Sequence, residues 1–384
     1  MYYFSINISS ICNVILYLVL ILFAMPFVFP NQEFLFILIQ FAFLIPLYLF
    51  FCTYQMRNSL FGLFLIFFYF ILLFLNIVGL PGSISAWMAM TCLGYIVGMK
   101  FVGSPEKIKS VFYYFTIILI VFTFWVLYKN YLNPFEHSEL SDYFQKSSIN
   151  SVPLLVVSMS NILCTLYYIQ FSNNESPKYF NNRGLLLLSV ILAVTVVIIF
   201  DFRSGSLIFL SLFFLIIDFF RLKSRIYLIV PIFVLLLSSN FLNLIFISFV
   251  SQGTDDLTNV GSELAAGALR YDRILEFWRI AGLNKVNFVS WSKHFSVSAL
   301  SDFIASLFPI SLFFLIIPIV GIYKLLIRVR INNLYYLLII LTSWLSSLVM
   351  TIMQPDFFSM FSFFLISSIL YFINKIQSAK MILK

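Results

Sequence analysis

The stretch SLFGLFLIFFYFILLFLNIVG, residues 59–79, decides the fold class. It contains no charged residue and is long enough to cross the hydrocarbon core of a bilayer as a helix, which takes about 20 residues. The rest of the 384-residue chain has the same character, with 62% hydrophobic residues, 10% charged residues and a mean hydropathy of +1.04. This composition excludes a soluble globular domain, a disordered chain and a barrel whose strands alternate apolar and polar residues. It predicts an all-α, polytopic integral membrane protein.

Apolar runs separated by polar breaks predict about twelve transmembrane helices in a single membrane domain, residues 1–384. The expected spans lie near residues 11–30, 34–52, 59–79, 83–102, 110–130, 152–171, 184–200, 205–220, 226–250, 301–323, 334–353 and 357–373. Short cytoplasmic loops of membrane proteins collect Lys and Arg, so the charges give the orientation. With these spans, 15 of the 23 basic residues fall on one side, which places both termini in the cytoplasm.

Two outward loops are long enough to carry function. The first, residues 131–151, is polar and acidic. The second, residues 251–300, contains an amphipathic helical pattern, because Tyr271, Ile274 and Trp278 fall on one apolar stripe. On this pattern Trp278 anchors the helix on the bundle or the membrane interface, or stacks on a sugar.

Arginines at the outer surface are candidates for binding a diphosphate. Guanidinium groups match phosphate oxygens bidentately and keep their charge when they are partly desolvated. Arg203 lies between two apolar spans, where it would hold a diphosphate or else pair with Asp201 in a tight turn. On the loop helix Arg270, Arg273 and Arg279 form the polar side, and the alternative for them is an ordinary solvated helix face.

His294 and Asp302 lie where the large loop returns to the membrane. Either side chain could act as a general base near the interface. For Ser301 and Asp302 the alternative is the N-cap of the following helix, since both residue types cap helices well.

Other classes of site are not indicated. Cys12, Cys52, Cys92 and Cys164 lie in apolar stretches without paired spacing, so they predict neither disulfides nor a zinc site. In a membrane protein the distribution of charge matters more than the net charge of +8, and nucleic-acid binding is not expected. The sequence has no phosphate-binding glycine loop, no zinc-protease motif and no nucleophile elbow.

Three segments in this order resemble the superfamily of O-antigen polymerases and ligases. Residues 200–207, FDFRSGSL, resemble the family's Ser-Arg-rich turn between two spans. Residues 267–278, GALRYDRILEFW, resemble the Arg-then-Trp helix of its large periplasmic loop, and residues 298–305, SALSDFIA, resemble the loop exit. Many relatives carry a His-Asn pair at this exit, whereas this chain has Ser301 and Asp302, which leaves the identity of the base open.

The resemblance implies a GT-C-like glycosyltransferase of the bacterial inner membrane that uses neither a metal nor another cofactor. As a Wzy-type polymerase it would act at the outer face on undecaprenyl-diphosphate-linked glycans, with a chain-length regulator as a possible partner protein. Arg203 and one of the loop-helix arginines would then hold the diphosphate, and Asp302 or His294 would be the base. Two alternatives stay open, a lipid-linked oligosaccharide flippase and an O-antigen ligase. The long loop 251–300 favours an enzyme over the flippase.

Overall fold

The structure, a computed structural model, describes residues 8–28, 33–77, 82–103, 151–172, 299–307, 310–328, 334–353 and 357–382, and the single positions 117, 118, 120, 121, 124, 125, 128, 191, 193 and 211. Every regular element in these residues is a helix, which confirms the all-α expectation for this part of the chain. The elements are α1 (Ile8–Val28), α2 (Glu33–Leu38), η2 (Ile39–Leu44), α3 (Ile45–Gln55), α4 (Leu60–Ile77), α5 (Gly82–Gly103), α8 (Ser151–Ser172), α13 (Ala299–Leu307), α14 (Ile310–Arg328), α15 (Leu334–Met353) and α16 (Phe357–Ile382).

Six of the predicted helical segments agree with these limits to within three residues at either end: 11–30, 34–52, 59–79, 83–102, 152–171 and 334–353. The prediction of one helix over 301–323 is wrong, because α13 ends at Leu307 and α14 begins at Ile310. Pro309 falls between the two helices in the sequence, and proline has no amide hydrogen and disfavours helical geometry in the residue before it. The last helix extends beyond the predicted end at 373 and reaches Ile382.

A π-helical turn, η2, interrupts the segment predicted at 34–52. Pro46 occupies one of the first two positions of α3 and cannot donate a backbone hydrogen bond. Next to it, the Ile45 amide donates to the carbonyl of Gln40, five residues earlier, as in a π-helix. Gln40 is buried, and its side-chain amide donates to the Val19 carbonyl at 3.0 Å, which ties η2 to α1.

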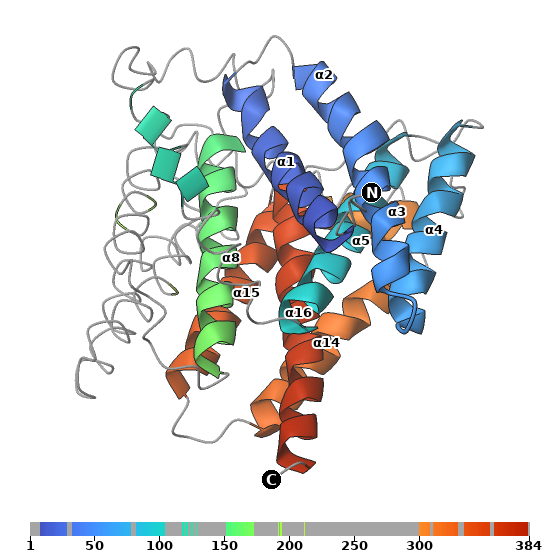
Figure 1. The fold of residues 1–384 in the computed structure, drawn as a ribbon. Coiled ribbons are helices and arrows are strands. Elements are labelled where there is room, and N and C mark those ends of the chain that lie inside the picture. Colours follow the sequence, from blue (N-terminus) through green and yellow to red (C-terminus); the bar gives the residue numbers. More distant parts are fainter. Residues whose placement is uncertain are drawn as a thin grey trace, which may run out of the picture.

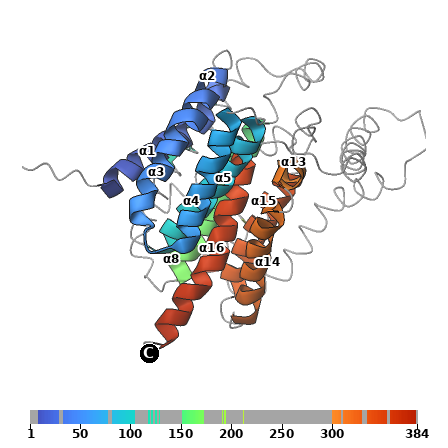
Figure 2. The ribbon, with the colours of Figure 1, turned by 90° about the vertical axis from the view of Figure 1, so that its right-hand side faces the viewer.

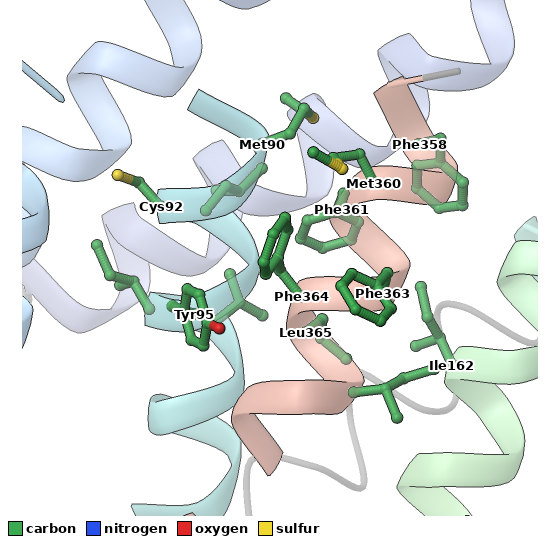
Figure 3. Close-up of a cluster of buried hydrophobic side chains, with 14 of the residues drawn as sticks. Met90, Cys92, Tyr95, Ile162, Phe358, Met360, Phe361, Phe363, Phe364 and Leu365 are labelled. Atoms are coloured by element: carbon green, nitrogen blue, oxygen red, sulfur yellow. The ribbon is translucent and has the colours of Figure 1, made fainter. Parts of the chain in front are cut away.

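Helix α16 lies at the centre of the described bundle, with α5, α8, α14 and α15 packed around it (Figures 1 and 2). Every residue from Phe358 to Leu370 is buried. A helix that is buried on all sides needs small or apolar residues around its whole circumference, and α16 has Phe, Leu, Ile, Met and Ser throughout this stretch. The core shown in Figure 3 is correspondingly rich in aromatic rings, such as Phe363 and Phe364, whose centroids are 5.0 Å apart.

The contact between α5 and α16 is very close. A Cβ atom added to Gly94 would lie 2.9 Å from the Leu365 nitrogen, and one added to Gly98 would lie 2.6 Å from the Ser368 Cβ. Only glycine permits such an approach of two helix backbones, and the two residues form the small-xxx-small pattern typical of tightly packed helices. Between them, Tyr95 accepts a 2.9 Å hydrogen bond on its carbonyl from Ser368 and donates its hydroxyl to the Phe314 carbonyl of α14 at 2.7 Å.

The contacts also give the relative directions of the helices. Helices α5 and α16 run parallel, because Gly94 lies against Phe364 and Gly98, further along α5, lies against Ser368. Helices α15 and α16 run antiparallel, since the side chain of Trp344 contacts Ser367 and that of Thr351 contacts Ser359. If the predicted spans alternate in direction along the chain, α5 and α16 must be parallel and α15 and α16 antiparallel.

Judged by length and composition, one stretch of the described residues could cross a membrane, Ile310–Ile327 of α14, while other apolar helical stretches run 10–17 residues. Four of the expected spans fall outside the described residues apart from single positions: 110–130, 184–200, 205–220 and 226–250.

Candidate functional site

Most of the predicted site residues lie outside the described residues. This holds for the arginines expected to bind a diphosphate, for the tryptophan of the loop helix and for the candidate histidine base: Arg203, Arg270, Arg273, Arg279, Trp278 and His294. Asp302 is an exception, because the structure describes its backbone, which belongs to α13. The described part of the candidate site is therefore the helix that follows the large loop.

Helix α13 is amphipathic, and its buried stripe fixes its position. Ala299, Phe303 and Leu307 recur every four residues and are each at most 1% exposed. The Phe303 ring lies 5.3 Å from that of Phe364 in α16 and 6.2 Å from that of Phe314 in α14. The segment that carries Asp302 is thus packed against the bundle core, and it contacts α5 and α15 as well as α14 and α16.

The N-cap interpretation of Ser301 and Asp302 is wrong, because α13 begins two residues before Ser301, at Ala299. Both residues lie within the first turn, and Ser301 is 7% exposed.

A second polar feature, which the sequence analysis missed, lies between α8, α15 and α16. We call it the polar seam and define it as Ser158 and Asn161 of α8, Ser346 and Ser347 of α15, and Ser362 of α16; all five are at most 1% exposed. Neighbouring hydroxyls such as those of Ser160 and Thr165 donate to carbonyls four residues earlier in their own helix.

Hydrogen bonds across the polar seam join the three helices. The Asn161 side-chain amide donates to the Ser346 hydroxyl at 3.1 Å. The hydroxyls of Ser347 and Ser362 are 3.2 Å apart, and the Ser362 hydroxyl donates to the Ser158 carbonyl at 3.3 Å. Such interhelical bonds stabilise helix association where no water competes.

The seam residues are uncharged over the whole physiological pH range, so they can position or bind a neutral group but cannot act as acid or base. The sequence contains a signal for the seam, because Ser, Thr and Asn recur at three- and four-residue spacing. They do so at positions 158, 161 and 165, at 343, 347 and 351, and at 359 and 362. Average hydropathy hides them within apolar runs.

The cysteines are buried thiols, as the sequence indicated: Cys12, Cys52, Cys92 and Cys164. Cys52 accepts a 3.0 Å hydrogen bond from the Lys100 ammonium group, which also lies 4.8 Å from the centre of the Tyr48 ring. These contacts join α3 to the end of α5. Within the described residues, no group of three or more His, Cys, Asp or Glu side chains could hold a metal ion.

Comparison with known proteins yields no relative. No protein-family model, no curated protein and no solved structure matches this chain.

Proposed function

We propose that the chain is an integral membrane protein of about twelve spans that polymerises lipid-linked glycan repeat units at the outer face of the bacterial inner membrane. The observation that carries the proposal is the order of the three segments 200–207, 267–278 and 298–305, which follows the order in O-antigen polymerases and ligases. The geometry of α13 supports it, since the end of the large loop is attached to the centre of the bundle.

Apolar side chains on the outside of the bundle support membrane insertion. Five large side chains of α4 and α14 are each 62–66% exposed: Phe67, Phe74, Ile319, Tyr323 and Ile327. Large apolar side chains exposed in this way are unfavourable in water and are well solvated by lipid tails. The parallel and antiparallel pairs of described helices are also those that alternating spans require.

The reaction would form a glycosidic bond without a nucleotide sugar. A hydroxyl oxygen of one repeat unit bonds to the anomeric carbon of another, and the bond from that carbon to the undecaprenyl diphosphate breaks. The leaving diphosphate takes the electron pair, so its developing charge needs cations near it. Arg203 and one of Arg270, Arg273 and Arg279 would supply them, and Asp302 or His294 would take the proton of the attacking hydroxyl.

A deletion strain tests the proposal, with surface glycans separated by size. We expect a single repeat unit on the glycan acceptor in place of a ladder, and restoration of the ladder by the wild-type gene. Loss of even the single unit would contradict a polymerase and indicate a flippase or a ligase. A flippase defect would leave the lipid-linked units on the cytoplasmic face of the inner membrane, whereas a ligase defect would leave them on its outer face.

A further inference from the structure

Two polar atoms of the polar seam have no hydrogen-bond partner in the part of the chain that the structure describes, the hydroxyl oxygen of Ser158 and the side-chain carbonyl oxygen of Asn161. Both side chains are at most 1% exposed. A buried polar atom without a partner is costly, and most such atoms in folded proteins are paired with protein or with an internal water molecule. The two residues are three positions apart on α8 and therefore lie on the same face of that helix.

We propose that the polar seam binds one internal water molecule, which bridges Ser158 and Asn161 where α8 faces α15 and α16. The water accepts a hydrogen bond from the Ser158 hydroxyl and donates one to the Asn161 carbonyl oxygen. The Ser362 hydroxyl, which donates to the Ser158 carbonyl at 3.3 Å, ties α16 to the same residue of α8. Internal waters typically make about three such bonds, and the two unpaired atoms of α8 supply two of them.

The assignment does not depend on which way the Asn161 amide is placed. As described, its nitrogen donates to Ser346 at 3.1 Å and its oxygen is unpaired. In the reversed orientation the oxygen would accept from the Ser346 hydroxyl and the nitrogen would be unpaired. One polar end of the amide is left for the water in either case.

The chemistry of the seam selects water over a cation. A metal ion or ammonium group would need a compensating negative charge at a site removed from solvent, and the five seam residues provide only neutral oxygens and one amide nitrogen. The ligand must also both accept and donate hydrogen bonds while fitting among fully buried side chains. Water meets both requirements.

The first test is thermal unfolding of the full chain in detergent for Ser158→Ala, with Ser160→Ala as the matched control. Ser160 is two residues away and similarly buried, and its hydroxyl donates within its own helix to the Val156 carbonyl at 2.8 Å. A bridging water predicts that Ser158→Ala lowers the melting temperature by about 2 °C or more, and by more than the control does. If the Ser158 hydroxyl is truly unpaired, its removal leaves the melting temperature unchanged or raises it, which would overturn the proposal.

The second test is a double-mutant cycle with Asn161→Ala. No direct hydrogen bond joins the two side chains in the structure, so a bridging water predicts that the double variant loses clearly less than the sum of the single losses. Additive losses would contradict the bridge.

The third test is a density map of the wild-type chain at a resolution that shows ordered water. This test does not require any variant to fold. We expect a peak within hydrogen-bond distance of the Ser158 hydroxyl and the Asn161 amide. A map in which these two side chains bond directly to each other would refute the proposal, even if the cycle showed coupling.

Discussion

Replacement of Gly98 by Ala tests the close packing of α5 on α16. The added Cβ would lie 2.6 Å from the Ser368 Cβ and 2.9 Å from the Leu365 carbonyl oxygen. Carbon atoms in contact are normally about 3.5–4.0 Å apart, so the two helices must separate by about 1 Å. Because the carbonyl is part of the α16 backbone, no rotamer change of a side chain relieves that contact.

Three contributions determine the expected change in the free energy of unfolding. Overpacking of a tight core costs about 1–3 kcal/mol. Displacement of Ser368 weakens its 2.9 Å hydrogen bond to the Tyr95 carbonyl, a loss of about 1 kcal/mol. Alanine in place of glycine within a helix returns up to about 1 kcal/mol. We therefore expect Gly98→Ala to lower the free energy of unfolding by about 1–3 kcal/mol.

Gly62→Ala is the matched control. Its added Cβ would lie 3.4 Å from the Met56 sulfur, the end of a flexible side chain, and 3.3 Å from the Ser59 hydroxyl, which accepts a 3.2 Å hydrogen bond from the Gly62 amide. Gly62 lies in the first turn of α4, and its added Cβ meets no backbone of another helix, so the control should stay within about 1 kcal/mol of the wild type. Denaturant unfolding in detergent, followed by tryptophan fluorescence, measures both variants. A Gly98→Ala variant as stable as Gly62→Ala would refute the described approach of α5 to α16.

Three further predictions concern the proposed function. A cysteine placed at Asn287 in a chain without native cysteines should react with a membrane-impermeant thiol reagent added from outside, and protection there would overturn the outward position of the large loop. Arg203→Lys keeps the charge but loses the planar fork, so polymerisation should fall strongly at normal membrane abundance, whereas a normal ladder from Arg203→Ala would remove this residue from the site. Arg270→Ala or Arg273→Ala should abolish long glycan chains and Arg279→Ala should only shorten them; the opposite ranking would mean that a different face of the loop helix binds the diphosphate.

Helix limits were largely predictable because polar breaks and apolar runs alternate clearly along the chain. The segment 334–353 matches α15 at both ends. The prediction failed where a local backbone rule overrides hydropathy. Pro309 leaves the apolar character of the sequence intact but falls between the end of α13 and the start of α14. Pro46 accompanies a π-turn within an otherwise uniform apolar segment.

Packing inside the bundle was not predicted, although its signals are in the sequence. Gly94 and Gly98 form a small-xxx-small pattern, and hydroxyl-bearing residues recur along α15 and α16. Neither pattern says which helix is the partner. That choice depends on complementary shapes, such as Ser368 fitting over Gly98, and on hydrogen bonds between residues as far apart in the chain as Asn161 and Ser346.

The described helices change the comparison between the two candidate bases, because a base must be held in place as well as have a suitable pKa. Asp302 belongs to a helix that Ala299, Phe303 and Leu307 fix against the bundle, so its backbone position is determined by core packing. Because α13 begins at Ala299, Asp302 lies inside the helix and not at its N-cap. Asparagine is almost the same size as aspartate but takes no proton at neutral pH. We therefore expect Asp302→Asn to accumulate normally in the membrane and to lose the glycan ladder. A normal ladder from this variant, with loss of the ladder in His294→Ala, would transfer the role of base to the histidine.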